Sequence, residues 1–295
     1  MIIKSFFIRR RSRSDIKSWC KKVCPLSCSI NPVVTWIGHS SFLIQIGGVN
    51  ILTDPIFGNN SFLFPRVLEA GISLDEIPNI DFVLISHNHR DHMDYRSLIR
   101  LKEHTETNFL VPLGDKKWFD RRKFSRVREH SWWDASDFAA KSEESKDIQF
   151  TFLPSKHWSQ RGLFDKNRSL WGSWLIEYNG MKIYFGGDTS YDSHFSEIGC
   201  EFPDIDVALL PIAPGEPRHW LKHSHIDSVE AGRSFLDLGA KHFIPMHWGT
   251  FSLGSELFDD PIILLQKWWG KNSKELMGKT LHLPKIGQPL KFDFM

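Results

Sequence analysis

Short apolar runs separated by Gly, Asn and Pro dominate the pattern of hydrophobic and polar positions along the chain. Their length and their content of β-branched and aromatic residues are typical of β-strands. The pattern predicts strands over residues 33–37, 42–46, 50–53, 81–86 and 109–112, and again over residues 148–153, 173–178, 181–185, 207–211 and 242–245. The stretches GGVN and YNGM indicate hairpin turns, one in each half of the chain.

Four segments have the character of helices. One is expected from Tyr95 to about His104, after Asp94 as the N-cap, and a second near residues 115–122. Residues 228–238 place Ala231 and Phe235 on one side, as an amphipathic helix does, and residues 261–270 form the fourth segment. Strand-rich halves with attached helices predict an α/β (α+β) fold in which two sheets pack together and the helices lie outside.

The composition, with 41% hydrophobic and 24% charged residues over 295 positions, is typical of a globular domain in water. No apolar stretch reaches the roughly 18 residues that a membrane-spanning helix requires, and no apolar core of a secretory signal is present. The four cysteines, Cys20, Cys24, Cys28 and Cys200, form no CxxC pair, so free thiols in a reducing compartment are expected. These features predict a cytoplasmic location.

The N-terminal segment is strongly basic, whereas the rest of the chain is mildly acidic. Residues 1–22 carry eight Lys or Arg residues against one acidic residue, a net charge of +7, and the remainder carries 29 basic and 34 acidic residues, a net charge of −5. This division predicts a basic arm over residues 1–30 and one domain over residues 31–295. Such an arm is either a solvated terminus or a segment that docks residues 1–22 on an anionic membrane surface, which would place the protein at a membrane periphery. No nucleic acid is expected as a partner, because basic residues outside the arm form no comparable cluster.

The stretch HNHRDH at residues 87–92 carries the clearest chemistry in the sequence. It directly follows the predicted strand 81–86, so His87 and His89, two positions apart, can converge from one side of an extended chain. Asp91 and His92 come next, at the start of the predicted helix. Imidazole nitrogens and carboxylate oxygens are ligands of zinc, and one zinc ion takes about four. Four such groups in one loop, with others elsewhere, indicate two metal ions.

Three further strand ends each offer one ligand. His157 follows the strand 148–153 in LPSKHWS, Asp188 follows two glycines in FGGDTSY, and His247 lies in FIPMHWGTF. A single histidine after a strand is more often a structural hydrogen-bonding group. Four strand ends with metal-binding side chains, taken together, predict a metal site.

The same residues carry a family resemblance. The HxHxDH run, followed by His157, Asp188 and His247, resembles the metallo-β-lactamase superfamily. The stretches TWIGHSSFLIQ, ILTDPIF, LWGSW and EPRHWLKHSHID are similar to the N-acylphosphatidylethanolamine-hydrolysing phospholipase D branch of that superfamily.

The resemblance implies a four-layer αββα metallo-β-lactamase sandwich with a dinuclear zinc site. In that site a hydroxide between two Zn²⁺ ions attacks the phosphorus of a lipid or lipid-like phosphodiester. The implied ligands are three residues for one ion, three for the other and one bridging carboxylate: His87, His89 and His157; Asp91, His92 and His247; and Asp188.

The resemblance also implies roles for residues around the metals. Asp91 would accept a proton from the attacking water. His225, in HSHID, matches a histidine that hydrogen-bonds the substrate or donates a proton, and a structural position before a helix is its alternative. Asp54, in LTDP, is expected to orient a ligand, and His39 to be structural or to lie near the metals without binding them.

Several alternatives stay open from sequence alone. Mn and Fe accept the same ligands as Zn. Lipid-cleaving members of the branch carry an aromatic residue before EP, where this chain reads APG at residues 213–215. These smaller side chains reduce the wall of the substrate site, which favours a small soluble lactone or phosphate ester as the substrate. The apolar loop 57–79 is either a lipid-facing lip or internal packing. A non-catalytic metal-binding protein recruited to a membrane is an alternative of another class, and Trp268–Trp269 fits either a homodimer contact or core packing.

Overall fold

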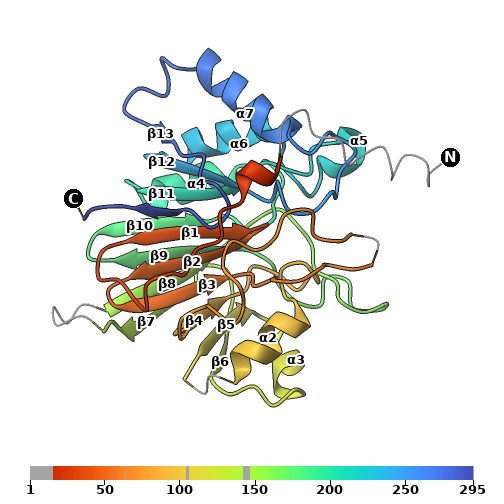
Figure 1. Ribbon diagram of the computed structural model, residues 1–295, viewed down its shortest axis with the longest axis vertical. Helices are drawn as coiled ribbons and strands as arrows, with labels where there is room; N and C mark the ends of the chain where they lie inside the picture. The colour runs from red at the N-terminus through yellow and green to blue at the C-terminus, as the bar shows by residue number, and fades with distance from the viewer. Residues whose placement is uncertain (1–15, 63, 104–105, 142–146, 295) are drawn as a thin grey trace.

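Two seven-stranded sheets form the centre of the computed structural model, which describes residues 16–62, 64–103, 106–141 and 147–294 (Figure 1). Neighbouring strands of the first sheet are, in order, β14 (Pro289–Lys291), β1 (Val33–Gly38), β2 (Ser41–Ile46), β3 (Val49–Thr53), β4 (Phe82–Leu84), β5 (Asn108–Pro112) and β6 (Val127–His130). Those of the second sheet are β13 (Thr280–Leu281), β12 (His242–Met246), β11 (Val207–Pro211), β10 (Met181–Phe185), β9 (Ser173–Tyr178), β8 (Asp147–Leu153) and β7 (Ala135–Ala139). Both sheets mix antiparallel and parallel pairs.

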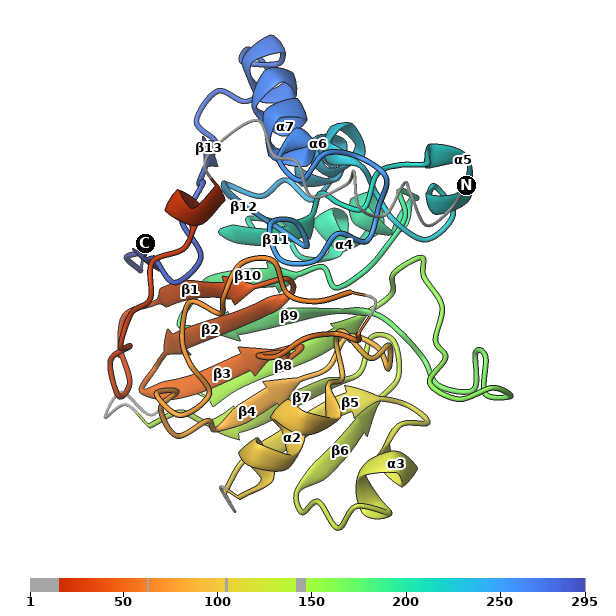
Figure 2. The same cartoon turned by 45° about the vertical axis from the view of Figure 1, so that its right-hand side comes forward.

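Helices lie outside both sheets, so the molecule has four layers (Figures 1 and 2). On the side of the first sheet lie α2 (Tyr95–Lys102) and α3 (Lys116–Asp120); on the side of the second lie α4 (His194–Glu201), α6 (Ser228–Asp237) and α7 (Asp260–Lys271). Two short helices, η1 (Ile16–Trp19) and α5 (Arg218–Leu221), stand apart from these layers. The αββα sandwich expected from the sequence is confirmed.

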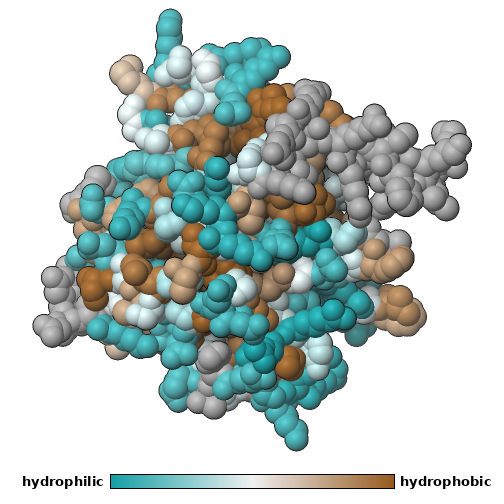
Figure 3. Space-filling model, in the orientation of Figure 1, coloured by the Kyte–Doolittle hydropathy of each residue, from teal (hydrophilic) through white to brown (hydrophobic). Residues whose placement is uncertain are grey.

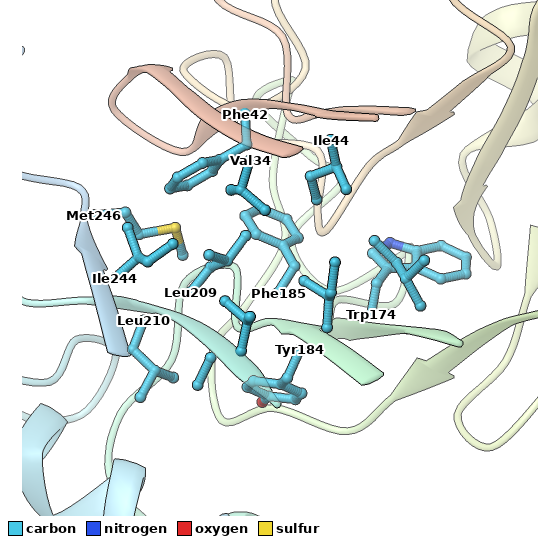
Figure 4. Packing of buried hydrophobic residues seen from close by; sticks show 14 of the residues in the cluster. Val34, Phe42, Ile44, Trp174, Tyr184, Phe185, Leu209, Leu210, Ile244 and Met246 are labelled. Carbon is cyan, nitrogen blue, oxygen red and sulfur yellow. The ribbon is translucent and has the colours of Figure 1, made fainter. Parts of the chain in front are cut away.

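Side chains alternate along the strands and fill two hydrophobic layers. On β2, Phe42 and Ile44 lie in the cluster between the sheets, whereas Leu43 lies in the cluster beneath α2 and α3. Figure 4 shows Phe42 and Ile44 of the first sheet facing Phe185 and Leu209 of the second. Because helices cover the outer faces, both sides of the central strands are buried, which is why these strands read as nearly continuous apolar runs.

The helices occur close to the positions that the sequence pattern predicts. α2 begins at Tyr95, and the Asp94 carboxylate accepts a hydrogen bond from Ser97 N at 2.9 Å, as an N-cap does. α6 begins after a capping box in which Asp227 accepts from Glu230 N. α2 ends at Lys102, and residues 104–105, which the prediction included, lie outside the described residues.

The strands that the pattern missed are the four edge strands β6, β7, β13 and β14. β6 reads VREH and β7 reads ASDFA, and most of their side chains are exposed or half-buried. An edge strand forms its backbone hydrogen bonds with one neighbour and needs few apolar side chains, so its apolar signal is weak.

The described part of the predicted basic arm lies against the domain. The Trp19 ring packs on Trp248 and Phe258, with centroid separations of 5.2 and 6.4 Å. Lys21 N donates to Ile286 O at 2.8 Å. Residues 1–15, which carry most of the positive charge of the arm, lie outside the described residues. The boundary between an arm ending at residue 30 and the domain therefore stays a prediction.

Trp268 and Trp269 pack within the chain. A Cβ added at Gly232 on α6 would come within 2.3 Å of the Trp268 ring, so glycine at that position permits the close contact between α6 and α7. The Trp269 ring lies 5.5 Å from the Phe235 ring. Internal packing accounts for this pair, and a homodimer stays a prediction.

Within the described ranges, no helix combines the length and the apolar character needed to cross a bilayer. The four cysteines all fall in these ranges and are free thiols. Cys20 is half-buried, and the other three are exposed.

Candidate metal centre

The metal-binding side chains predicted from the sequence meet at one end of the sandwich. Residues 87–92 follow β4, His157 follows β8, Asp188 follows β10 and His247 follows β12. β8 and β10 run in the same direction because both pair antiparallel with β9, and β10, β11 and β12 are mutually parallel. The carboxyl ends of these strands therefore lie at one edge of the second sheet, where open α/β folds place their sites.

Three imidazole nitrogens form the first group of candidate ligands. His87 Nε2 and His157 Nε2 lie 2.9 and 3.2 Å from His89 Nδ1. Nitrogens bound tetrahedrally to one metal ion at about 2.0–2.1 Å are separated from each other by about 3.3 Å. The three nitrogens thus have nearly the separation that a shared metal ion requires, and the residues fit such an ion.

Asp91, His92 and His247 form the second group, with His39 beside them. His92 Nε2 lies 3.3 Å from His247 Nε2 and 3.7 Å from Asp91 Oδ2. One carboxylate and two imidazoles are again donors suited to a divalent transition metal.

Asp188 lies between the two groups. Its Oδ1 is 3.0 Å from His247 Nε2, and its Oδ2 is 3.2 Å from His92 Nε2. The same Oδ2 is 3.9 Å from His87 Nε2 and 3.8 Å from His157 Nε2. This carboxylate, 3% exposed, reaches the donors of both groups and has the position of a bridging ligand.

Asp54 orients one imidazole of each group. Its Oδ2 accepts hydrogen bonds from His92 Nδ1 at 2.7 Å and from Ser86 Oγ at 2.5 Å. Ser86 Oγ in turn accepts from His87 Nδ1 at 2.9 Å. With the proton held on Nδ1, both rings turn the lone pair of Nε2 toward the metal positions. The orienting role expected of Asp54 thus has a geometric basis that extends to two ligands.

The pKa values of the imidazoles in the first group suit metal binding. Burial lowers the pKa of His87 and of His157 well below the ordinary value. The His157 Nδ1 proton is held by the backbone oxygen of Ser224 at 2.8 Å. Both residues are therefore neutral at pH 7, and each directs Nε2 at the centre.

In the second group, opposite charges shift the pKa values of His92 and Asp91 in opposite directions. Burial opposes the charge of His92, but the carboxylates of Asp188, Asp91 and Asp54 outweigh burial and raise its pKa well above the ordinary value. Burial by itself would raise the pKa of Asp91, yet the charge of His92 and a hydrogen bond from His39 outweigh it and lower that pKa. In the metal-free protein, His92 holds a proton that a bound metal ion would displace.

His39 touches the site through Asp91. Its Nε2 lies 3.1 Å from Asp91 Oδ2, and its ring centroid lies 3.9 Å from that of His247. Burial lowers the pKa of His39 to about 3, so the neutral ring donates its Nε2 proton to the carboxylate. His39 Nδ1 has no hydrogen-bond partner among the described residues. The sequence left His39 either structural or near the metals without binding them, and it did not indicate the hydrogen bond to Asp91.

Three residues of the site have backbone dihedrals in the left-handed region. The φ angles are 54° at His39, 31° at Asp54 and 66° at His247. This conformation costs a residue other than glycine about 1–3 kcal/mol and persists where surrounding contacts hold it, typically at functional sites. One such contact is the hydrogen bond of 3.1 Å from His247 N to His39 O.

His225 lies beside both ligand groups. Its Nδ1 is 3.7 Å from Asp188 Oδ2, and its ring centroid is 5.2 Å from that of His157. Burial lowers the pKa of His225 to about 4, so the ring is neutral at pH 7. Arg218 fixes the backbone here by donating from Nη1 to His225 O at 2.8 Å. The geometry places His225 near both groups, and its role stays a prediction.

Sequence reasoning missed a buried network behind the HxH pair. Asn88 Nδ2 donates to Asp115 Oδ1 at 3.0 Å, and Ser169 Oγ donates to the same atom at 2.7 Å. Arg161 Nη1 donates to Asn88 O at 3.2 Å. Ser169 and Arg161 belong to the segment that carries His157, so this network ties two ligand-bearing loops together. Asn88 offered a signal, because a buried amide between two ligands requires partners.

Asp115 makes the stability of the metal-free protein depend on pH. Burial raises its pKa to about 6, so the folded state holds this proton more tightly than the unfolded chain, where the pKa is about 4. Its contribution to the free energy of unfolding is complete below about pH 4 and is lost as the pH rises to about 6, by up to about 3 kcal/mol. We expect Asp115→Asn, which keeps the accepting oxygen, to remove this loss.

Urea unfolding of both proteins at several pH values, with a chelator present, measures the difference. The variant should gain stability relative to the unmodified chain between pH 4 and pH 7. A difference that stays constant over this range would contradict the expectation.

A model of the β-lactamase superfamily domain matches residues 49–248, a range that contains all seven candidate ligands. The chain belongs to the metallo-β-lactamase superfamily. Within this superfamily it is similar to N-acyl-phosphatidylethanolamine-hydrolyzing phospholipase D 1 of Caenorhabditis elegans, with 34% identity over 75% of this chain and 65% of the relative. It is also similar to the mitochondrial N-acyl-phosphatidylethanolamine-hydrolyzing phospholipase D of Saccharomyces cerevisiae, with 34% identity over 88% of this chain and 56% of the relative. The chain thus spans less than two thirds of the length of either relative.

Solved structures of the superfamily fold superpose on most of the chain. The metallo hydrolase Igni18 of Ignicoccus hospitalis has a TM-score of 0.67 and 20% identity, covering 90% of this chain and 100% of its own. CmlA of Streptomyces venezuelae, a diiron β-hydroxylase, has a TM-score of 0.63 and 16% identity, covering 90% of this chain and 55% of its own. At such identities the likeness concerns the fold alone.

Proposed function

We propose that this protein is a metal-dependent phosphodiesterase that hydrolyses an N-acylated phospholipid at the bond between phosphorus and the ethanolamine oxygen. The observation that carries the proposal is the position of Asp188, whose carboxylate lies within 3.9 Å of donors from two separate ligand groups. A shared carboxylate suits two adjacent metal ions, the arrangement used for displacement at phosphorus. The two relatives named phospholipase D favour the lipid substrate.

The seven ligands proposed are those expected from the sequence, and the metals proposed are two Zn²⁺ ions. Two divalent ions in such a site act as Lewis acids and activate a water molecule at neutral pH. The diiron neighbour CmlA makes iron the competing choice. Elemental analysis of the purified protein distinguishes the two metals and counts the ions per chain.

The residues of the chain supply orientation and proton transfer. Asp91 is ionised at neutral pH because its pKa is lowered, and it accepts the proton of the attacking water while His39 holds its Oδ2. The new bond joins water oxygen to phosphorus, the phosphorus–oxygen bond to ethanolamine breaks, and the leaving oxygen takes up the proton that Asp91 accepted. The neutral ring of His225, mostly buried beside Asp188, directs an N–H at the phosphoryl or leaving oxygen. The products are an N-acylethanolamine and a phosphatidic acid.

A single assay tests the reaction class and the substrate together. Zinc-reconstituted protein is incubated with N-acylphosphatidylethanolamine in detergent micelles, and the products are read by mass spectrometry, beside Asp91→Asn. We expect both products from the unmodified chain and at least about 10²-fold less from the variant. No turnover with two metal ions bound per chain would discard the lipid substrate.

A small soluble lactone or phosphate ester is the second candidate substrate. The observation that favours it is the tight packing behind His247, where Ala213, Pro214 and Phe251 line a cavity of about 20 Å³. A space of this size holds about one water molecule, so no acyl chain enters there. Turnover of soluble esters without turnover of the lipid would favour this candidate, and metal binding without either activity would favour a non-catalytic protein.

The basic arm is proposed to dock on an anionic membrane surface, and the protein is proposed to be cytoplasmic and peripheral to the membrane. Each Lys or Arg close to such a surface contributes about 1 kcal/mol, and the attraction is screened by salt. Deletion of residues 1–15 should weaken binding to anionic vesicles at low salt and leave the metal content unchanged. This deletion keeps Trp19, which packs on Trp248. Equal binding of both proteins at low salt would dispose of this role of the arm.

A further inference from the structure

Four of the most exposed large hydrophobic side chains lie on loops that also carry residues of the candidate metal centre. The exposed fractions are 98% for Phe62, 86% for Leu163 and for Phe164, and 73% for Trp220. They lie on three loops, defined by residues 54–66, 154–172 and 212–225, which we call the rim. An exposed apolar side chain on its own is ordinary, but several gathered around one site indicate an interaction surface.

Each rim loop is joined to the metal centre by a residue of the site. The segment 54–66 begins at Asp54, which orients two candidate ligands. The segment 154–172 carries His157, and the segment 212–225 ends at His225 beside Asp188. Figures 1 and 2 show the orange segment after β3, the green segment after β8 and α5 at the same right-hand edge of the sandwich. In Figure 3, hydrophobic side chains are visible at this edge, over the projecting green segment.

Polar contacts at the base of two loops hold their tips away from the domain. In the first loop, Arg66 N donates to Asn59 Oδ1 at 2.8 Å and Arg66 Nη2 donates to Ile56 O at 2.5 Å, which closes the loop on either side of Phe62. In the second loop, the Asp165 carboxylate accepts from Gly162 N at 2.8 Å, which closes a turn around Leu163 and Phe164.

Two further hydrogen bonds hold the second and third loops. Asn167 N donates to Ser159 O at 2.7 Å and closes the second loop at its base. Arg218 fixes the third loop through its hydrogen bond to His225 O, at the start of the short helix that carries Trp220. Hydrogen bonds at the bases of the three loops thus hold the apolar tips out in solvent.

We propose that the rim enters the interface of a phospholipid bilayer and sets the metal centre against the lipid head groups. The proposal rests on the proposed function, because it names the surface that would present a lipid substrate to the site. Separate apolar tips with polar bases suit a bilayer, whose interface accepts each Phe, Leu or Trp side chain independently. A protein partner would instead require a continuous complementary patch.

Charge near the tips complements a membrane surface. Lys166 and Arg168 follow the second tip, Lys222 follows the third, and all three side chains are exposed. None of the three forms an ion pair with a carboxylate among the described residues. Lys166 Nζ lies 5.4 Å from the centroid of Trp158, whose ring is 4.2 Å from that of His89. Exposed cations close to the tips in the chain would meet lipid phosphates at the membrane surface.

The test compares two full-length variants in vesicle binding. One replaces Phe62, Leu163, Phe164 and Trp220 by Ser. The control is Met277→Ser, at a side chain that is 83% exposed. Met277 lies in the segment between α7 and β13, at the opposite edge of the sandwich (Figures 1 and 2). Metal content and thermal unfolding of both variants establish that the fold is intact.

Binding is measured by flotation with phosphatidylcholine vesicles that contain roughly one quarter phosphatidic acid, at low salt and at about 0.5 M NaCl, which screens the basic arm. We expect the rim variant to bind about 10²-fold more weakly at the higher salt, and the Met277 variant to bind as the unmodified chain does.

Equal binding by the unmodified chain and the rim variant, or no binding by the unmodified chain, would overturn the proposal. If equal binding is accompanied by a dimer that dissociates in the rim variant during analytical ultracentrifugation, the rim joins two copies instead. The micelle assay of the unmodified chain decides the proposed function separately, because its substrate reaches the site without a bilayer.

Discussion

Asp188→Asn is expected to lower turnover by about 10³-fold or more and to reduce the bound metal below two ions per chain. The carboxylate of Asp188 lies within 3.2 Å of His92 and His247 and within 3.9 Å of His87 and His157. Asn has nearly the same shape, so packing is kept. One anionic oxygen becomes an NH₂ group that cannot bind a metal ion, and the negative charge that the two proposed metal ions would share is lost.

Asp192→Asn is the matched control for this experiment. Asp192 lies four residues further along the same segment, and its exposed carboxylate pairs with Lys156. Its replacement should leave turnover and metal content within about twofold of the unmodified chain, as expected for a surface pair. Metal titration followed by calorimetry, with turnover measured on the same samples, checks both variants. Two tightly bound ions in Asp188→Asn would show that Asp188 does not bridge the two metal ions.

Asp54→Ala is expected to destabilise the fold by about 3–5 kcal/mol, which is the largest stability effect that we anticipate. The Asp54 side chain is fully buried and accepts hydrogen bonds from His92 Nδ1, Ser86 N and Ser86 Oγ. Its removal leaves the buried His92 without the carboxylate that holds its proton, and leaves two donors of Ser86 without an acceptor. Affinity for metal should also fall by about 10–100-fold, because His92 and His87 lose the groups that orient them.

Asp75→Ala provides the comparison at an exposed carboxylate. Asp75 pairs with Arg100 at 2.8 Å on the surface, so its loss should change the free energy of unfolding by no more than about 1 kcal/mol. Urea unfolding in the presence of a chelator separates the effect on the fold from the effect on metal binding. A loss below about 1 kcal/mol for Asp54→Ala would show that the fold accommodates His92 without this partner.

The sequence was sufficient for the candidate ligands because they belong to short local patterns. The HxHxDH spacing places four donors in one loop, and each remaining donor lies within four residues of the end of an apolar run that forms a buried strand. A buried strand must end where its apolar residues end, so the position after it is a loop at the sheet edge. Local chemistry and local periodicity therefore identified His157, Asp188 and His247 without knowledge of how the strands are ordered.

The surroundings of the ligands depended on contacts between residues far apart in the chain. His39 reaches Asp91 across 52 positions, and Asp115 reaches Asn88 across 27. No periodicity links such pairs, and each residue alone resembles an ordinary polar residue. The same holds for the rim, where three loops come together only because β3, β8 and β11 end at one edge of the sandwich.

By itself, the sequence determined two packed sheets with helices outside and the candidate metal-binding side chains, because alternation along strands, the capping of helices and the spacing of donors are properties of neighbouring residues. The resemblance of its motifs to a known family indicated the superfamily and its αββα sandwich. The tertiary structure decided the rest: the pairing of edge strands such as β6 and β7, the position of Asp188 between the two ligand groups, the hydrogen bonds that set the tautomers of His87 and His92, and the exposure of the rim. These features follow from the order and direction of strands in two packed sheets, which bring distant residues within 4 Å of one another and leave the loop tips outside the core.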